Sequence, residues 1–366
     1  MIRCDRDRMA VHIGGLPEAE PAVWQPFELG LAAIAAYQWD QALEHFQNAH
    51  AEASGAQLVP LCNQIGVCHY GQGRPDDALA DFEESARLAK QYGDERGMAP
   101  AFGNIGVIRH EYGELGSALD HLSEALAIAR KFGDQAAAAL YLGNIGNVHR
   151  DRGELDEALK LHQDALAISH GIADQPGVAS CLRNIGSVYR NQGKLGKALR
   201  YYEEALAISR QTGDRSGSAS DLGNIGGIHR YRGELDEALM FYEDAFELEC
   251  KIGRQAGVAT ALANIGFILA FKGLYKQAVL TFAESLAILL ATGVAPGPRQ
   301  ALFGLSLCDD QLGRGRTQEL LKEAGLPDAS TADLLDRIDQ MRLSRPQQVS
   351  GRRVPFALRR LMAGAG

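Results

Sequence analysis

The chain of 366 residues lacks most of the features that mark secreted or membrane proteins. Its six cysteines are scattered and form no Cys-x-x-Cys pair, which argues against a disulfide framework. No apolar stretch approaches the length that spans a bilayer, and residues 1–15 carry charges but no apolar run of signal-peptide length. We therefore expect a cytoplasmic protein without membrane insertion, whose free thiols are mostly buried as small hydrophobes.

The chain also lacks an excess of positive charge. Lysine and arginine number 37 against 46 aspartates and glutamates, so the net charge is −9. This balance favours solubility and argues against nucleic acid as the default partner.

What the sequence does contain is an internal repeat with a period of forty residues. The segment LGNIGNVHRDRGELDEALKLHQDALAISH, residues 142–170, has close copies around residues 102, 182, 222 and 262. Three small residues keep their phase in six successive copies, namely a first glycine (Gly66, Gly106, Gly146, Gly186, Gly226, Gly266), a second glycine (Gly73, Gly113, Gly153, Gly193, Gly233, Gly273) and an alanine (Ala78, Ala118, Ala158, Ala198, Ala238, Ala278). A repeat of this length predicts a solenoid.

Apolar residues in each copy fall three and four positions apart on both sides of the second glycine, which predicts two amphipathic helices. Gly153 is expected to close the first helix in a left-handed conformation. Gly146 lies inside that helix, where glycine costs about 0.5–1 kcal/mol relative to alanine, so a neighbouring helix must approach closely. Ala158 is expected to be buried for the same reason. A Gly-Asp pair ends several copies and supplies the next helix with an N-cap. Pro100 implies that the helix after Asp94 is kinked or starts later.

The period divides the chain into five segments. We expect a flexible leader at 1–21, a divergent first repeat at 22–54, six regular repeats at 57–297, a degenerate repeat with a capping helix at 298–343, and a basic, disordered tail at 344–366. Degenerate terminal units close the apolar ends of a solenoid.

These helix pairs resemble the tetratricopeptide repeat (TPR), in a forty-residue form similar to that of Pins-type spindle-orientation adaptors and kinesin light chains. The residues that carry the resemblance are Leu142–Gly146, Gly153–Leu159 and the closing segments Ala127–Asp134 and Ala207–Asp214. The resemblance implies an all-α, right-handed superhelical solenoid of about seven to eight helix pairs with a C-terminal capping helix. It also implies that the first helix of each pair lines a concave groove.

Asparagine recurs at one groove-facing phase in five successive repeats, as Asn104, Asn144, Asn184, Asn224 and Asn264. Asparagine has no helix-propensity reason to recur in mid-helix, and its amide can both donate to and accept from a peptide backbone. We call these five residues the asparagine ladder. Their amides either hold an extended segment of a partner protein or bond adjacent helices and lock their stacking.

Arginine recurs at a second phase as Arg150, Arg190 and Arg230, with Arg183 about one turn away. Arginine suits carboxylate recognition because it can bind both oxygens. The alternative is a solvated helix end that pairs with Asp151 or with acids of the next repeat. Tyr231 and Phe271 are the aromatic candidates for an apolar pocket in the C-terminal half.

The sequence offers no candidate catalytic, metal or cofactor site. His149 and His229 lie two repeats apart, and one repeat already separates equivalent residues by ~10 Å, whereas zinc needs ligands at about 2 Å. The local group Cys62, Cys68 and His69 fits no standard metal-site spacing, and the acids around Asp156 favour the positive end of a helix. No nucleophile–base pair or phosphate loop is present.

These observations predict a non-enzymatic interaction scaffold that binds an extended or helical, acidic segment of another protein in the groove. The alternative is a regulator of bacterial type that senses a peptide or modulates a partner enzyme. The oligomeric state does not follow from the sequence.

Overall fold

The computed structural model describes residues 21–292 and 298–343, and every regular element in these two ranges is helical. The expected leader and tail lie outside the described residues, apart from Pro21. Among the described residues, no helix combines the length and apolar character that crossing a membrane requires.

The elements follow one another with short connections. In chain order they are α2 (Pro21–Ala35), α3 (Trp39–Glu52), the 3₁₀ turn η1 (Gly55–Gln57), α4 (Leu58–Gly71), α5 (Pro75–Tyr92), α6 (Glu95–Glu111), α7 (Leu115–Lys131), α8 (Gln135–Asp151), α9 (Leu155–Gly171), α10 (Gln175–Asn191), α11 (Leu195–Gln211), α12 (Arg215–Arg232), α13 (Leu235–Ile252), α14 (Gln255–Phe271), α15 (Tyr275–Thr292), α16 (Pro298–Leu312), α17 (Arg314–Glu323) and α18 (Asp328–Leu343).

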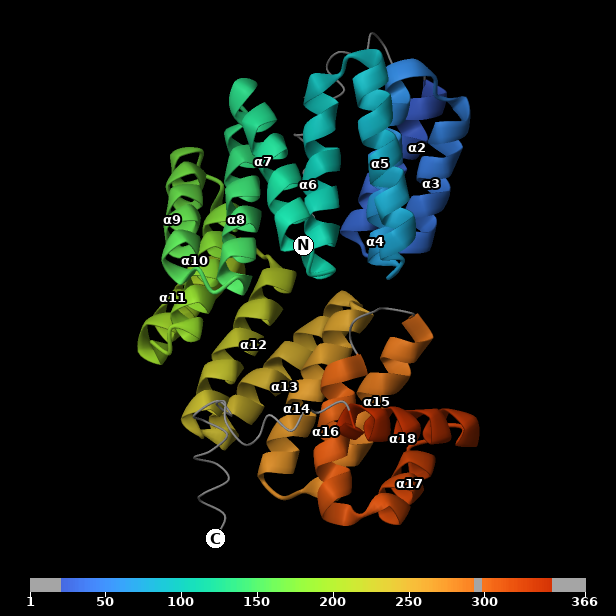
Figure 1. The fold of residues 1–366 in the computed structure, drawn as a ribbon, viewed down its shortest axis with the longest axis vertical. Coiled ribbons are helices and arrows are strands. Elements are labelled where there is room, and N and C mark those ends of the chain that lie inside the picture. The colour runs from blue at the N-terminus through green and yellow to red at the C-terminus, as the bar shows by residue number, and fades with distance from the viewer. Residues whose placement is uncertain (1–20, 293–297, 344–366) are drawn as a thin grey trace. The chain divides into compact units, whose positions relative to one another are not determined.

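Consecutive helices pack as pairs, as Figure 1 shows for α6 with α7 and for α12 with α13. The chain forms two compact units, residues 1–197 and 198–366. In the first unit the second helix of each pair packs on the first helix of the next pair (α3 on α4, α5 on α6, α7 on α8, α9 on α10), so the described residues of this unit form an array of stacked helical hairpins. The second unit ends with α16, α17 and α18, whose apolar residues share one core with α14 and α15. The all-α array of paired helices that the repeat predicted is confirmed.

The first glycine and the alanine of the repeat lie where the two helices of a pair approach most closely. A methyl group added to Gly146 would lie 2.8 Å from the ring of His162, and one added to Gly106 would lie 2.7 Å from Leu122. Ala158 is fully buried. The prediction that glycine inside the first helix reflects close packing is therefore confirmed, and the neighbour is the second helix of the same pair.

The turns follow the expected chemistry. Gly153 has a φ of +82°, in the left-handed region where glycine is favoured. Asp94 and Asp134 cap the following first helices by accepting hydrogen bonds from Gly97 N (2.9 Å) and Ala137 N (2.8 Å). Helix α6 begins directly after Asp94 and contains Pro100, so of the two alternatives the later start is excluded. The aspartate cap fixes the start of the helix, and Pro100 lies in its second turn.

The first helices of the pairs come close to one another within the first unit. Helices α4, α6, α8 and α10 are in contact in sequence order, in addition to the contacts that each makes with its second helices. These four helices therefore form a continuous layer, which we call the first-helix layer, and its outward-facing side chains are the candidate binding residues.

Candidate functional site

The asparagine ladder begins with an amide that bonds another amide. Asn104 on α6 donates from Nδ2 to Oδ1 of Asn63 on α4 at 3.0 Å, and both side chains are buried. The two residues are 41 positions apart, which is one repeat and one residue. At this end of the ladder the amide therefore joins neighbouring first helices, which is the stacking role.

The next two asparagines have no such partner. In the first unit, the described residues include no hydrogen-bonding group paired with the half-buried amides of Asn144 or Asn184. The reason lies 41 positions earlier, where Gly103 and Gly143 carry no side chain. The amide nitrogen of Asn184 lies 4.0 Å from the position that a methyl group on Gly143 would take. Both amides therefore retain their capacity to donate and accept.

The second unit holds the two remaining members of the ladder. Asn264 on α14 accepts at Oδ1 a hydrogen bond of 3.1 Å from Nε2 of Gln300 on α16. Asn224 on α12 is half-buried and has no hydrogen-bond partner among the described residues. The two ends of the ladder thus bond to neighbouring helices, while the three central amides do not.

The arginine phase differs from repeat to repeat. Arg150 donates from Nε to Asp151 Oδ1 at 3.0 Å and from a terminal nitrogen to Asn147 Oδ1 at 3.0 Å, so the paired-helix-end alternative holds for this residue. Asp151 is also bonded to His110 Nε2 of α6 at 2.8 Å. Burial opposes the charged form of Asp151, but Arg150 and His110 together hold the pKa of this carboxyl below its ordinary value.

The other arginines have no comparable carboxylate at the following position. Arg190 is followed by Asn191, and the described residues contain no ion pair with Arg190. The guanidinium of Arg230 lies 5.5 Å from the ring centroid of Tyr231, and its buried Nε has no hydrogen-bond partner among the described residues. Arg183 lies half-buried on α10, at the position next to Asn184. Of these arginines, Arg190 and Arg230 remain available for an anionic ligand.

The aromatic candidates of the second unit lie in different surroundings. Tyr231 is an exposed residue beside Arg230. Phe271 packs on Phe267 with ring centroids 6.4 Å apart, and Phe267 in turn lies 6.2 Å from the ring of Phe303 of α16. The two candidates therefore have no aromatic neighbour in common among the described residues.

The repeat pattern did not point to Phe303 or Asn63, which both take part in these contacts. Phe303 lies in the degenerate repeat, which has lost the glycine and alanine landmarks, so no repeat phase pointed to it. Asn63 carried a usable signal, because it lies 41 residues before Asn104, and this is the offset at which the side chains of neighbouring first helices meet.

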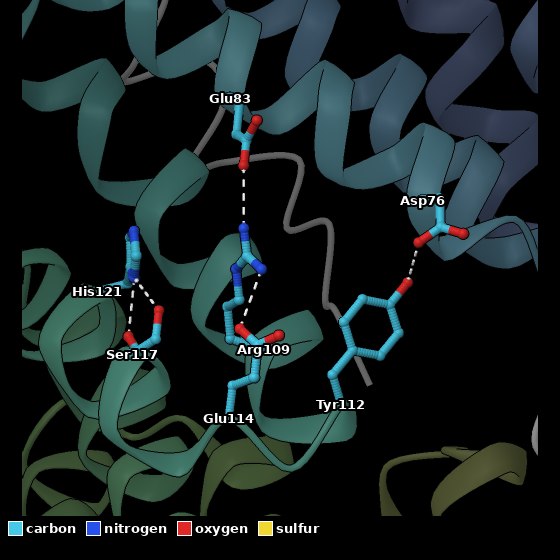
Figure 2. Close-up of polar contacts among 7 residues, drawn as sticks. All are labelled: Asp76, Glu83, Arg109, Tyr112, Glu114, Ser117 and His121. Atoms are coloured by element: carbon cyan, nitrogen blue, oxygen red, sulfur yellow. Dashed lines mark hydrogen bonds and ion pairs between the residues drawn. The ribbon is translucent and has the colours of Figure 1, made fainter.

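A basic side chain bonded to a carboxylate closes the turn inside several helix pairs. Figure 2 shows Arg109 of α6 between Glu83 of α5 and Glu114, which lies directly before α7, at 3.3 and 3.0 Å. The equivalent pair in α12 and α13 joins His229 Nδ1 to Glu234 at 2.6 Å, and His149 bonds Glu154 in α8 and α9. These pairs have one member in the last turn of the first helix and the other directly before the second. We call them turn clamps.

The remaining reactive groups do not assemble into a site. Burial raises the pKa of the Cys62 thiol to about 11 and that of Cys308 to about 12, so both remain protonated and unreactive at neutral pH. Among the described residues no three histidine, cysteine or acidic side chains converge in a way that could hold a metal ion. His162 is buried completely against Gly146, and neither of its ring nitrogens has a hydrogen-bond partner in the described part of the chain.

Comparison with known proteins agrees with this architecture. A tetratricopeptide-repeat family model matches residues 58–131, 135–211 and 218–291, which is more than half of the chain. This chain belongs to the tetratricopeptide-repeat family. A search of curated protein sequences found no match.

Three solved structures share the fold at low sequence identity. A Rap protein complexed with Competence and Sporulation Factor is 18% identical, with a TM-score of 0.61, and the match covers 93% of this chain and 96% of that one. The Rap conjugation gene regulator of plasmid pLS20, in complex with the Phr* peptide, is 15% identical with a TM-score of 0.60 and coverage of 74% of each chain. Aspartyl phosphate phosphatase F from Bacillus subtilis is 14% identical, with a TM-score of 0.58 and coverage of 77% and 73%. At these identities the likeness concerns the fold.

Proposed function

We propose that this protein is a non-enzymatic interaction scaffold that binds an extended segment of another protein on its first helices. The observation that carries the proposal is the unequal use of the asparagine ladder. Asn104 and Asn264 bond neighbouring helices, whereas Asn144, Asn184 and Asn224 are half-buried amides without a partner among the described residues. A polar group in such a position is stabilised when a ligand backbone supplies the missing hydrogen bonds.

The chemistry of the amides suits a peptide backbone. Amides bind the N–H and C=O groups that every residue presents, so the ladder would hold a segment whatever its side chains. Two of the structures with a similar fold were solved with a peptide or with Competence and Sporulation Factor, and this supports a peptide as the kind of ligand for a TPR array of this form.

We further propose that the bound segment is acidic. Arg190 in the first unit and Arg230 in the second lie on the same helices as Asn184 and Asn224, and neither is neutralised by a carboxylate among the described residues. Arg150 is already paired with Asp151 and contributes less. Arginine binds carboxylates through two parallel hydrogen bonds, which gives both affinity and orientation.

The test replaces the central amides and spares the terminal ones. The triple variant Asn144→Ala, Asn184→Ala, Asn224→Ala is expected to lose its partners in a pull-down read by mass spectrometry, while its thermal midpoint stays close to that of the parent chain. The matched control Asn104→Ala, Asn264→Ala removes amides that bond helices, so it should lower the thermal midpoint and keep the partners. If the triple variant folds and its partners are unchanged, the assignment of the binding face is wrong.

The second candidate function is a peptide-sensing regulator of bacterial type. The similarity of the fold to Rap proteins, one of them a conjugation gene regulator, favours it. Such a protein needs an effector segment, and the sequence offers the basic segment 344–366 for that role. Deleting residues 344–366 separates the two candidates, since binding by a scaffold survives the deletion and an activity carried by this segment is lost.

A further inference from the structure

One repeat carries the opposite charge from its neighbours. Residues 175–214 contain six basic residues (lysine or arginine) and three acidic ones. The preceding repeat, residues 135–174, contains three basic and six acidic residues, and the following repeat, residues 215–254, contains five basic and eight acidic residues. The period and the small core residues are the same in all three. The reversal is therefore a property of the surface of this repeat and not of its packing.

The reversal is concentrated in the turn between α10 and α11. In the turn clamps the residue directly before the second helix is a glutamate, namely Glu114, Glu154 or Glu234. In the turn between α10 and α11, Lys194 occupies the position of these glutamates. Tyr189 on α10 occupies the position that Arg109, His149 and His229 have on the other first helices. The ammonium group of Lys194 lies 5.8 Å from the centroid of the Tyr189 ring.

A second lysine lies over the same ring. The ammonium group of Lys197 is 5.2 Å from the Tyr189 centroid, and Lys197 occupies the position at which α9 has Glu157 and α13 has Glu237. Both lysine side chains are exposed, and neither forms an ion pair within the described ranges. Two exposed cations thus converge on one aromatic ring, and each repels the other.

The position of these lysines on the helix is also unfavourable. The N-terminal end of a helix carries a partial positive charge, so acids stabilise it and cations destabilise it. Helices α5, α9 and α13 follow this rule with two acids each in the first turn, whereas α11 has none and has Lys197 there. The arrangement lowers the stability of the free protein, and an anion placed between the two lysines would offset both repulsions.

We propose that Tyr189, Lys194 and Lys197 form a second binding surface, distinct from the asparagine ladder, that takes a short run of aspartate or glutamate side chains from another protein. Two ammonium groups over one ring match two neighbouring carboxylates, and the tyrosine ring supplies apolar contact for their methylene groups. A short acidic segment fits better than nucleic acid, because the preceding turn of the same unit carries Glu154 and repels a long polyanion.

The experiment measures binding of a fluorescein-labelled hexaglutamate peptide to the full chain by fluorescence anisotropy, at low salt and at physiological salt. The variant Lys194→Glu, Lys197→Glu installs residues that α9 and the turn before it already carry at the equivalent positions, so it should fold with an unchanged or higher thermal midpoint. We expect at least about tenfold weaker binding, which corresponds to about 1.4 kcal/mol. The variant Lys194→Arg, Lys197→Arg should retain binding, because it keeps both charges.

The matched control is Lys90→Glu, Lys160→Glu, which makes the same change in net charge at two exposed lysines on α5 and α9. Equal weakening in the two glutamate variants, or no weakening in the first, would overturn the proposal. Tighter binding of a short DNA duplex that depends on Lys194 and Lys197 would overturn the choice of partner. If the parent chain forms a dimer and the lysine substitutions dissociate it, the surface binds a second copy of this chain. That result also overturns the choice of partner. The weakening caused by Lys194→Glu, Lys197→Glu should also be seen in the triple asparagine background, where any binding by the ladder is removed, so this surface and the proposed function can fail separately.

Discussion

Two helix pairs with nearly the same sequence, α8 with α9 and α12 with α13, differ in what lies behind their conserved glycine. Gly146 faces His162, which is fully buried and has two ring nitrogens without a partner in the described residues. Gly226 faces the ring of Tyr242, which is also buried, and the hydroxyl of Tyr242 lies near Gly227. The same backbone thus accepts an apolar ring with a polar tip or an imidazole whose hydrogen-bonding capacity is unused.

The comparison shows which positions the repeat holds fixed. Small residues at the glycine and alanine phases are required in both pairs, because the helices approach too closely for anything larger. The residue that fills the remaining space varies among Phe82, Leu122, His162, Tyr242 and Phe282, so its shape matters more than its chemistry. Only His162 in this set has a side chain whose ordinary pKa lies near neutral pH.

The largest expected effect concerns the pH dependence that His162 introduces. Burial, with a smaller contribution from the charge of Arg150, lowers the pKa of His162 to about 4 from an ordinary value near 6.5. The unfolded chain therefore binds a proton between about pH 6.5 and pH 4 that the folded chain does not. The free energy of unfolding is therefore unaffected by this proton above about pH 6.5. It falls as the pH is lowered and is smaller by about 3 kcal/mol at pH 4.

The variant His162→Leu isolates this contribution, because Leu122 fills the equivalent space behind Gly106. It should be more stable than the parent at pH 7, by about 1–3 kcal/mol, since it removes two unpaired buried nitrogens. Urea unfolding should show that the free energy of unfolding differs less between pH 4.5 and pH 7 in this variant than in the parent chain. An unchanged difference would mean that His162 is already charged in the folded protein.

A smaller effect is expected from adding a methyl group at the conserved glycines. Gly146→Ala places the new carbon 2.8 Å from the His162 ring, and Gly226→Ala places it 3.0 Å from the Tyr242 ring. Overpacking of this kind costs about 1–3 kcal/mol, so both variants should unfold at lower urea concentration. Gly223→Ala, on the same helix as Gly226 but with nothing within 4 Å, is the control and should gain about 0.5–1 kcal/mol. Loss of stability in the control would refute the packing explanation.

The smallest effect concerns the turn clamps that the two pairs share. Glu154→Gln and Glu234→Gln each weaken a pair whose carboxylate is open to solvent, His149 with Glu154 and His229 with Glu234. Each substitution should cost between about 0.2 and 1 kcal/mol in the free energy of unfolding, as is usual for a solvent-exposed polar pair. Thermal unfolding of both variants measures it, and a cost well above this range at either site would contradict the view that the clamps are weak surface pairs.

Much of the architecture followed from the sequence because its causes are local. The left-handed Gly153 and the aspartate caps depend on residues a few positions apart, so the pattern predicts them directly. The helical pairs follow in the same way from the spacing of apolar residues. The start of α6 did not follow, because Pro100 and the Asp94 cap favour different starting points and the sequence does not rank them.

The candidate site depended on contacts that the repeat period conceals. A forty-residue period aligns Asn104 with Asn144, but the positions that could bond them lie 41 residues back, where one has Asn63 and the other has Gly103. Equivalent residues therefore have different roles. Arg150 and Arg190 differ for a similar reason, since an aspartate follows one and an asparagine follows the other.

The helix pairs, their turns and the close approach behind the first glycine can be predicted from the sequence, since each of these follows from neighbouring residues within one repeat. The folded chain is needed to see which amides remain open, which arginine is neutralised and that Lys194 and Lys197 share the ring of Tyr189. This is because hydrogen bonds and ion pairs are satisfied between helices. A partner that is distant in the sequence can remove or preserve the binding capacity of a residue whose own identity stays the same.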